Sequence, residues 1–498
     1  MMILDRALSW REVGEIAAGE GIRLSDGARE RIRAARRIVD ALSASNVRAY
    51  GINTGVGALC DVVIDAGKLR SLSRNIIMSH AVGVGPVLGA PETRAILAAA
   101  INNFARGHSG IRLEVVETLA ALLNGDCLPE VPAGGSVGYL THMAHVALVL
   151  LGEGAARVRG QPLPALDALR TIGVSPVVLE AKEGLSLVNG TPCATGLSAY
   201  ALGRIERLLD WADAIAAMAF ENLHGQIAAF DAEVLGLRSS PALAEVGARL
   251  RAILKGSEIL DASAGRRTQD ALSLRAIPHV HGAAREHFAF AAGVIDRELA
   301  SATDNPLVAG TPAAPRAHSS AHAVGAAVGL CADSLGVALA EVAAMSERRI
   351  DRLVNPLVSG LAPFLAADGG AGSGLMIAQY TAVSLVAQNR RLAAPASLDG
   401  GVTSGLQEDH LCHATPAALK LLKIVDNAEL VLAIEMLAAA QAYDLRPRGR
   451  TQAPGTRRLF DAIRARVPIY LDDRPLGVDI GRVAELMRRF ESDEVTIP

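Results

Sequence analysis

The stretch AVGAAVGLCADSLGVALAEVAAMSERRIDRLV, residues 323–354, decides the fold class. It is rich in Ala, Leu and Val and predicts one long helix. Further Ala- and Leu-rich stretches predict long helices at residues 288–303, 376–391 and 416–443. The alternation of apolar and polar residues that is typical of strands never extends over a convincing length. The sequence therefore predicts an all-α fold with a bundle of long helices.

Composition favours closely packed helices and narrows the possible partners. Half of the 498 residues are hydrophobic but only 3% are aromatic, so Ala, Leu, Val and Ile must make up most of the core. The formal net charge is only -3 and the charges are mixed, which argues against a nucleic-acid or polybasic membrane surface. We expect the partner to be a small molecule.

Cysteine usage and the start of the chain indicate the compartment. The five cysteines are scattered and form no C-x-x-C pair, which favours a reducing environment. Asp5 and Arg6 interrupt the beginning of the chain, so it does not resemble a signal peptide. Asp333 and Glu341 interrupt the longest apolar stretch, which argues against a membrane span. A cytoplasmic protein is expected.

Loops and helices are unevenly distributed along the chain. Glycine-rich loops at residues 50–59, 132–138 and 184–191 interrupt the first part, and composition changes to Pro, Arg and Gly near Asp444. We therefore predict a loop-rich N-terminal helical domain at 1–200, a central helical bundle at 201–445 and a tail packed on the body at 446–498.

Polar clusters fall at the predicted helix–loop junctions, where a helical enzyme would place its site. Each cluster also has an ordinary structural interpretation, such as a turn anchor or the start of a helix. Composition and spacing alone indicate a large cytosolic helical protein, most simply an enzyme. The clusters lie at residues 50–55, 79–80, 189–191, 269–275, 303–306 and 407–410.

Taken together, the motifs resemble the histidine and aromatic amino-acid ammonia-lyases. Ten segments follow the order and approximate spacing of that family and cover residues 45 to 445. They are YGINTGVG, LSRNIIMSHAVGVG, ARGHSGIR, VPAGGSVG, KEGLSLVNGTPCATG, RTQDALSLR, SATDNPLV, SERRIDRLVNPLVSGL, GLMIAQYTA and TSGLQEDH.

The resemblance implies a fumarase- or aspartase-like helical architecture and a homotetramer whose sites are shared by three subunits. It also implies elimination of ammonia from an α-amino acid, which needs a base for a weakly acidic β-proton and an electrophile. In that family the electrophile is methylidene-imidazolone (MIO), which forms from an internal Ala-Ser-Gly.

Site roles are carried over from the same motifs. Tyr50 matches the tyrosine base, and Asn189 matches the asparagine near the electrophile and the substrate amine. Arg275 matches the arginine that binds the substrate carboxylate, and Gln269 belongs to the same segment. His80 and Glu408 match positions that contact the ring or assist proton transfer in histidine-specific members, so the pattern is closer to the histidine branch.

The chain departs from the family at the electrophile. Its loop contains Ser136 and Gly138, but Tyr139 follows directly where the family has Ala-Ser-Gly, and His142 replaces a proline. Ser136 cannot substitute for the serine of that tripeptide, because cyclisation needs a glycine directly after the serine. No cofactor is therefore encoded, although MIO is expected for the family.

Two explanations are open for this gap. Either the protein has lost the tripeptide, or an already modified residue was skipped when the sequence was written down. Leu272 and Ala321 also stand where the family has a tyrosine and a phenylalanine, and such correlated changes favour loss.

Three functions follow as alternatives. The first is ammonia elimination from histidine or an aromatic amino acid. The second is an MIO-less enzyme that uses the same carboxylate-binding pocket for another acid-base elimination, addition or isomerisation. The third is a non-catalytic scaffold, against which the retained polar set counts. The His142–His145 and His410–His413 spacings suggest metal only weakly, and we assign no metal site.

Overall fold

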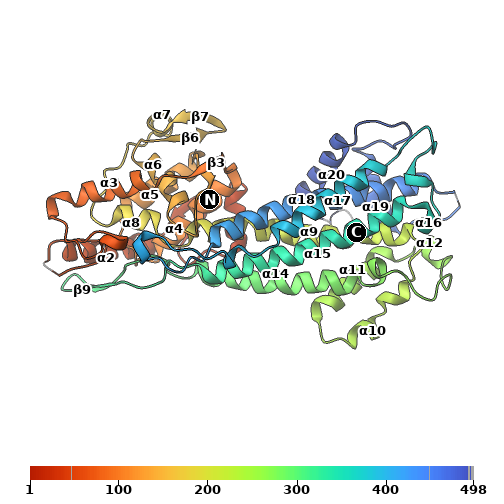
Figure 1. The fold of residues 1–498 in the computed structure, drawn as a ribbon, viewed down its shortest axis with the longest axis horizontal. Helices are drawn as coiled ribbons and strands as arrows, with labels where there is room; N and C mark the ends of the chain where they lie inside the picture. Colours follow the sequence, from red (N-terminus) through yellow and green to blue (C-terminus); the bar gives the residue numbers. More distant parts are fainter. Residues whose placement is uncertain (46, 448, 492–493, 495–498) are drawn as a thin grey trace. The chain divides into compact units, whose positions relative to one another are not determined.

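The computed structural model describes residues 1–45, 47–447, 449–491 and 494. Long helices dominate it, which confirms the all-α prediction (Figure 1). The helices are α1 (Trp10–Ala17), α2 (Asp26–Ser43), α3 (Leu69–His80), α4 (Ala90–Ala105), α5 (Leu113–Asn124), α6 (Thr141–Leu150), α7 (Ala165–Thr171), α8 (Glu183–Val188), α9 (Pro192–Asn222), α10 (Ala232–Gly236), α11 (Pro241–Leu254), α12 (Glu258–Asp261), α13 (Leu272–Arg275), α14 (Ile277–Leu299), α15 (Ala326–Val354), α16 (Pro356–Ser359), α17 (Met376–Leu392), α18 (Ala414–Asp444), α19 (Pro454–Arg464) and α20 (Gly477–Arg489).

The strands are short and support loops rather than a central sheet. Strands β1 and β2 pair in parallel, whereas β3–β5, β4–β6–β7 and β8–β9 pair antiparallel. The strands are β1 (Met2–Leu4), β2 (Ile22–Leu24), β3 (Val84–Val87), β4 (Cys127–Pro129), β5 (Pro132–Gly134), β6 (Ala155–Val158), β7 (Gln161–Pro164), β8 (Leu307–Thr311) and β9 (Ala314–His318).

The chain forms two compact units, each made of three separate segments. Unit 1 comprises residues 1–203, 291–333 and 395–422, and unit 2 comprises residues 204–290, 334–394 and 423–498. Most boundaries fall inside long helices, so α9, α14, α15 and α18 each contribute residues to both units. Composition predicts continuous domains with boundaries at residues 200 and 445, because it does not reveal a division within a helix.

Unit 1 is organised by capped and fully buried helices. Helix α1 starts at a capping box in which the Ser9 and Glu12 side chains bond reciprocally to the backbone, and Ser25 caps α2. Residues 93–105 of α4 are all buried, so this helix runs through the interior. The Ala-rich composition suits such close packing on every side.

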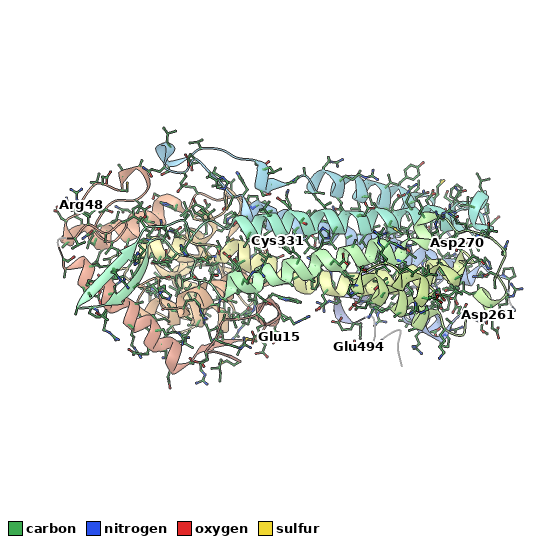
Figure 2. All side chains as sticks on the ribbon, turned by 90° about the horizontal axis from the view of Figure 1, so that it is seen from below. Glu15, Arg48, Asp261, Asp270, Cys331 and Glu494 are labelled. Atoms are coloured by element: carbon green, nitrogen blue, oxygen red, sulfur yellow. The ribbon has the colours of Figure 1, made fainter. Side chains whose placement is uncertain are left out.

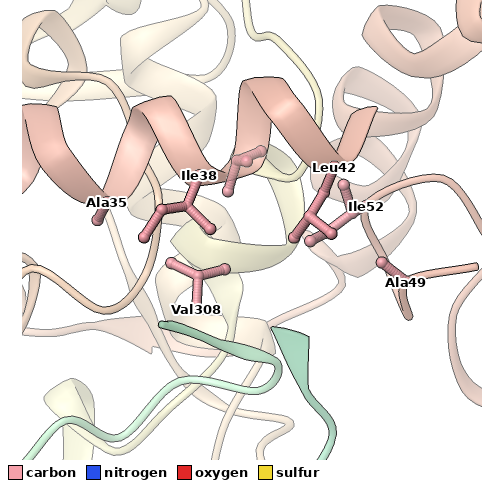
Figure 3. Packing of buried hydrophobic residues seen from close by; sticks show 7 residues of the cluster. Ala35, Ile38, Leu42, Ala49, Ile52 and Val308 are labelled. Atoms are coloured by element: carbon pink, nitrogen blue, oxygen red, sulfur yellow. The ribbon is translucent and has the colours of Figure 1, made fainter. Parts of the chain in front are cut away.

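One face of α2 holds the loop that carries Tyr50. Ile38 and Leu42 of α2 pack with Ala49 and Ile52, which flank the tyrosine, and with Val308 of β8 (Figure 3). Burial of these apolar side chains fixes both ends of the loop on a rigid helix. The position of Tyr50 is therefore determined by core packing.

Two groups of buried charges in unit 2 are paired. Arg349 and Glu435 are both inaccessible and bond at 2.6 Å, and Asp213 accepts from Arg285 at 2.6 Å and lies 2.7 Å from His281 Nδ1. Such pairing is what allows ionic groups to remain in a helical interior.

Helix α15 is long and apolar enough to cross a membrane by length and composition alone. However, 61% of its most apolar window is buried within the protein, as in the core helix of a soluble protein. It also contains Asp333, whose carboxylate accepts the Ser397 N–H at 2.8 Å.

Candidate active site

The Tyr50 loop is tightly constrained. Gly51 adopts φ +59°, and a Cβ at this position would lie 2.2 Å from a methyl carbon of Leu185, so glycine is required. The half-buried Tyr50 hydroxyl accepts a hydrogen bond from the Gly57 N–H at 3.2 Å. Burial raises the pKa of Tyr50, the Gly57 hydrogen bond opposes this, and the Glu408 carboxylate adds to the increase.

Glu408 is the common electrostatic partner in this part of unit 1. Its carboxylate acts on Tyr50, His80 and Tyr139, three side chains from separate segments of the chain. The Thr403 hydroxyl donates to Glu408 Oε2 at 2.9 Å, and the two residues also form a backbone bridge. The structure therefore brings together four residues that the sequence analysis singled out.

His80 is the last residue of α3. Its Nδ1 lies 3.0 Å from the Ser79 hydroxyl. Burial lowers the pKa of His80, while Glu408 opposes this decrease. A neutral imidazole is therefore favoured at pH 7, and it can accept or donate a hydrogen bond.

The loop that leads into α6 is closed by its own hydrogen bonds. The Ser136 hydroxyl donates to the Tyr139 carbonyl and accepts from the Gly138 N–H, both at 3.1 Å. Leu140 follows with φ +75°, and its N–H donates to the Val188 carbonyl at 3.1 Å. Burial raises the pKa of the Tyr139 phenol strongly, and Glu408 adds to this effect.

Gly138 lies against the start of α18. Its φ is +143°, and a Cβ there would lie 2.8 Å from Cys412 Sγ. Its carbonyl accepts from the Thr415 hydroxyl at 2.9 Å, and the neighbouring Val137 carbonyl accepts from the His413 N–H at 2.9 Å. This loop is thus fixed on both sides.

Several helix N-termini meet beside this loop. Gly325 and Thr191 directly precede α15 and α9, and Ala414 is the first residue of α18. A Cβ added to Gly325 would lie 3.0 Å from Thr191 and 3.2 Å from Ala414. Thr415, in the first turn of α18, holds Gly138 near the start of α6. Partial positive charge at converging N-termini stabilises negative charge nearby.

Asn189 has structural partners in this arrangement. Its Nδ2 donates to the Asn305 carbonyl at 2.7 Å, and its Oδ1 accepts from the Gly190 N–H at 3.0 Å. The neighbouring Asp304 binds the Lys182 ammonium at 2.8 Å, and both of these side chains are completely buried. This ion pair anchors the segment that holds Asn189.

Gln269 and Arg275 belong to unit 2. With its amide oxygen facing the guanidinium, Gln269 accepts from Arg275, which also donates to the Asp270 carbonyl. Asp270, labelled in Figure 2, is buried and binds Arg267 at 2.9 Å. Leu272, in the same segment, is 64% exposed.

Among the described residues, His142 makes no hydrogen bond to Tyr50, His80, Tyr139 or Glu408. It is buried in α6, and its Nε2 lies 3.0 Å from the Ala133 carbonyl. Burial lowers its pKa, so the ring is neutral. Within the described ranges there is no group of three His, Cys, Asp or Glu residues that could hold a metal ion.

Some residues near the site had no signal in the sequence. Cys412 lies close to Gly138 and acts electrostatically on Tyr139, yet it is one of five scattered cysteines. Lys182 and Asp304 are 122 positions apart, so only the tertiary fold reveals their pairing.

Comparison with known proteins agrees with this geometry. The family model for aromatic amino acid lyases matches residues 8–465. A histidine ammonia-lyase of Sorangium cellulosum is 44% identical over 98% of this chain and 97% of its own length. The crystal structure of a Trypanosoma cruzi histidine ammonia-lyase has a TM-score of 0.91 at 35% identity, covering 99% of this chain and 94% of that one.

A tyrosine aminomutase from Streptomyces globisporus is also similar, with a TM-score of 0.93 and 32% identity over 99% of this chain and 98% of that one. In both sequence and structure, these matches cover nearly the whole chain. The chain therefore belongs to the aromatic amino acid lyase family.

Proposed function

We propose that this protein is a carbon–nitrogen lyase that eliminates ammonia from histidine, and that it does so without MIO. The observation that carries the proposal is the grouping of Tyr50, His80 and Tyr139 around Glu408. The histidine ammonia-lyases among its relatives support the substrate.

The residues present do not fit the MIO group. No Ala-Ser-Gly occurs anywhere in the sequence, and Gly138 is followed by Tyr139. Gly138 itself has no space for a side chain beside Cys412. The elimination is therefore assigned to side chains of the chain alone.

Tyr50 is the proposed base. Its phenolate removes a β-proton from the bound amino acid. The electron pair of the broken C–H bond must then be stabilised by delocalisation. The raised pKa of Tyr50 makes the phenolate scarce at pH 7 but strongly basic once it has formed.

Histidine supplies its own electron sink when its ring is protonated. The pair from the β-C–H bond neutralises the imidazolium and gives an exocyclic double bond. The same pair then forms the Cα–Cβ double bond while the Cα–N bond breaks, and the ammonium group leaves as ammonia. Phenylalanine and tyrosine rings carry no positive charge and cannot accept the pair in this way.

Glu408 suits a protonated substrate ring. A carboxylate within contact distance favours an imidazolium over a neutral imidazole. The neutral His80 can hydrogen-bond to the ring without repelling its charge. The Arg275 guanidinium is proposed to bind the substrate carboxylate through two parallel N–H groups.

A homotetramer in the cytoplasm is proposed as the working state. Exposed apolar side chains on the helices, including Phe290, Ile377 and Tyr380, support burial against other copies.

Kinetic measurement of ammonia release tests the proposal. We expect purified protein to release ammonia from histidine, with far lower rates from phenylalanine and tyrosine. Tyr50→Phe should reduce kcat about 10²–10⁴-fold, the usual contribution of a positioned base. Equal rates with all three amino acids, or full activity of Tyr50→Phe, would reject the mechanism. A folded protein that releases no ammonia from any of them would favour a scaffold.

A further inference from the structure

A cavity lies in unit 2, built from residues that the proposed reaction does not use. It measures about 910 Å³ and is formed where the ends of α12, α16, α18 and α19 meet. Asp261 and Asp270, which flank the segment containing Arg266, lie at the same end of this unit in Figure 2. The cavity is lined by His224, Arg266, Tyr443, Arg446, Arg450 and Arg457.

The cavity carries an excess of positive charge. Its acidic member, Asp444, is already neutralised by Arg464 at 2.5 Å, and Arg457 is paired with Asp461 at 2.9 Å. Over the described part of the chain, Arg266, Arg446 and Arg450 have no carboxylate within 4.0 Å. Three guanidinium groups therefore line one cavity without a direct ion pair, and the buried Glu221 carboxylate acts only on Arg446, from beyond 4.0 Å.

His224 adds a hydrogen-bond donor to this set. The Arg446 guanidinium can only donate, so His224 Nε2 accepts its hydrogen bond at 3.0 Å, and the neutral ring must carry its proton on Nδ1. This Nδ1 is buried and has no partner among the described residues. Burial, together with repulsion from Arg446, Arg266, Arg267 and Arg450, lowers the pKa of His224 to about 4.

We propose that this cavity is a binding site for a phosphate-bearing small molecule. Guanidinium groups bind phosphate oxygens through paired N–H donors, and three of them match the charge of a diphosphate better than that of a single carboxylate. The unpaired Nδ1–H supplies one further donor to an acceptor oxygen. The volume falls within the range of small-molecule sites, so it can hold more than a phosphate group alone.

Calorimetric titration of the purified full-length protein with inorganic pyrophosphate tests this site. We expect saturable binding with one pyrophosphate per chain at an ionic strength of about 0.15 M, where weak surface attraction is largely screened. The variant Arg266→Gln/Arg450→Gln should bind about tenfold more weakly or worse, because two charge-assisted contacts are lost. Both residues are exposed, and neither side chain hydrogen-bonds to another described residue, so the fold should persist.

The matched control is Arg390→Gln/Arg391→Gln, which removes the same charge from an exposed end of α17 in the same unit. It should bind pyrophosphate as the original protein does. Absence of saturable binding to the original protein would overturn the proposal. Equal weakening in both double variants would also overturn it, because attraction would then depend on net charge alone.

Discussion

Replacing Asp304 by asparagine should strongly destabilise unit 1. The Asp304 carboxylate binds the Lys182 ammonium at 2.8 Å, and both side chains have no accessible surface. Asparagine is nearly the same size, so the change removes charge without leaving a large cavity. Of its side-chain partners among the described residues, Lys182 then keeps the Ser186 hydroxyl, at 2.8 Å.

The magnitude follows from the uncompensated charge. Burial already lowers the pKa of Lys182, and Asp304 is the main group that opposes this. Removing one partner of a buried ion pair costs about 3–5 kcal/mol of unfolding free energy. The activity should fall as well, because Asp304 precedes Asn305, whose carbonyl holds the Asn189 side chain.

Urea unfolding followed by circular dichroism, at one fixed protein concentration, measures the loss. The control is Glu485→Gln, which breaks an exposed Arg489–Glu485 pair and should cost no more than about 0.5 kcal/mol. The second variant, Lys182→Met/Asp304→Asn, should regain most of the lost stability because no buried charge remains. A loss below about 1 kcal/mol for Asp304→Asn would refute the reasoning.

Other predictions concern the proposed reaction. Between about pH 7 and 8.5, kcat/KM for histidine should be nearly constant. The phenolate fraction of Tyr50 rises about tenfold per pH unit in this range, because its pKa is raised. The protonated fraction of the substrate ring, with a pKa of about 6.5, falls about tenfold per pH unit and offsets this rise. A tenfold rise per pH unit would show that the ring proton is not needed. Glu408→Gln should lower the pKa of the Tyr139 phenol, because a neighbouring negative charge is lost, and ultraviolet titration of the phenols measures this change. The same variant should reduce activity towards histidine, which ammonia assays measure. Arg275→Lys should raise KM about 10-fold or more with the fold unchanged, because lysine cannot bind a carboxylate with two parallel N–H groups. An unchanged KM would show that Arg275 does not bind the substrate carboxylate.

The fold was largely predictable because its signal is local. Ala- and Leu-rich stretches specify long helices, and α15 extends over residues 326–354 within the predicted 323–354. The division into two units was not predictable, since its boundaries fall inside such helices. Hydrophobic periodicity continues through a helix whichever unit its residues pack in.

The site was predictable only through the motifs. Tyr50 and Glu408 are 358 positions apart in sequence, and no rule of composition brings them together. Their roles remain predictions, although the structure groups them. The cavity in unit 2 could not be predicted from the sequence. The arginines at positions 266, 446 and 450 resemble ordinary surface residues, and only the fold of unit 2 places them around His224.

The central claim is that this chain eliminates ammonia from histidine without MIO. Ammonia release from histidine by protein whose intact mass has been verified tests it most directly. We predict ammonia release by a chain whose mass equals that of its sequence, 51.7 kDa. A folded protein of that mass that releases no ammonia, or an active protein that is heavier than its sequence by Ala-Ser-Gly less two waters, would contradict the claim.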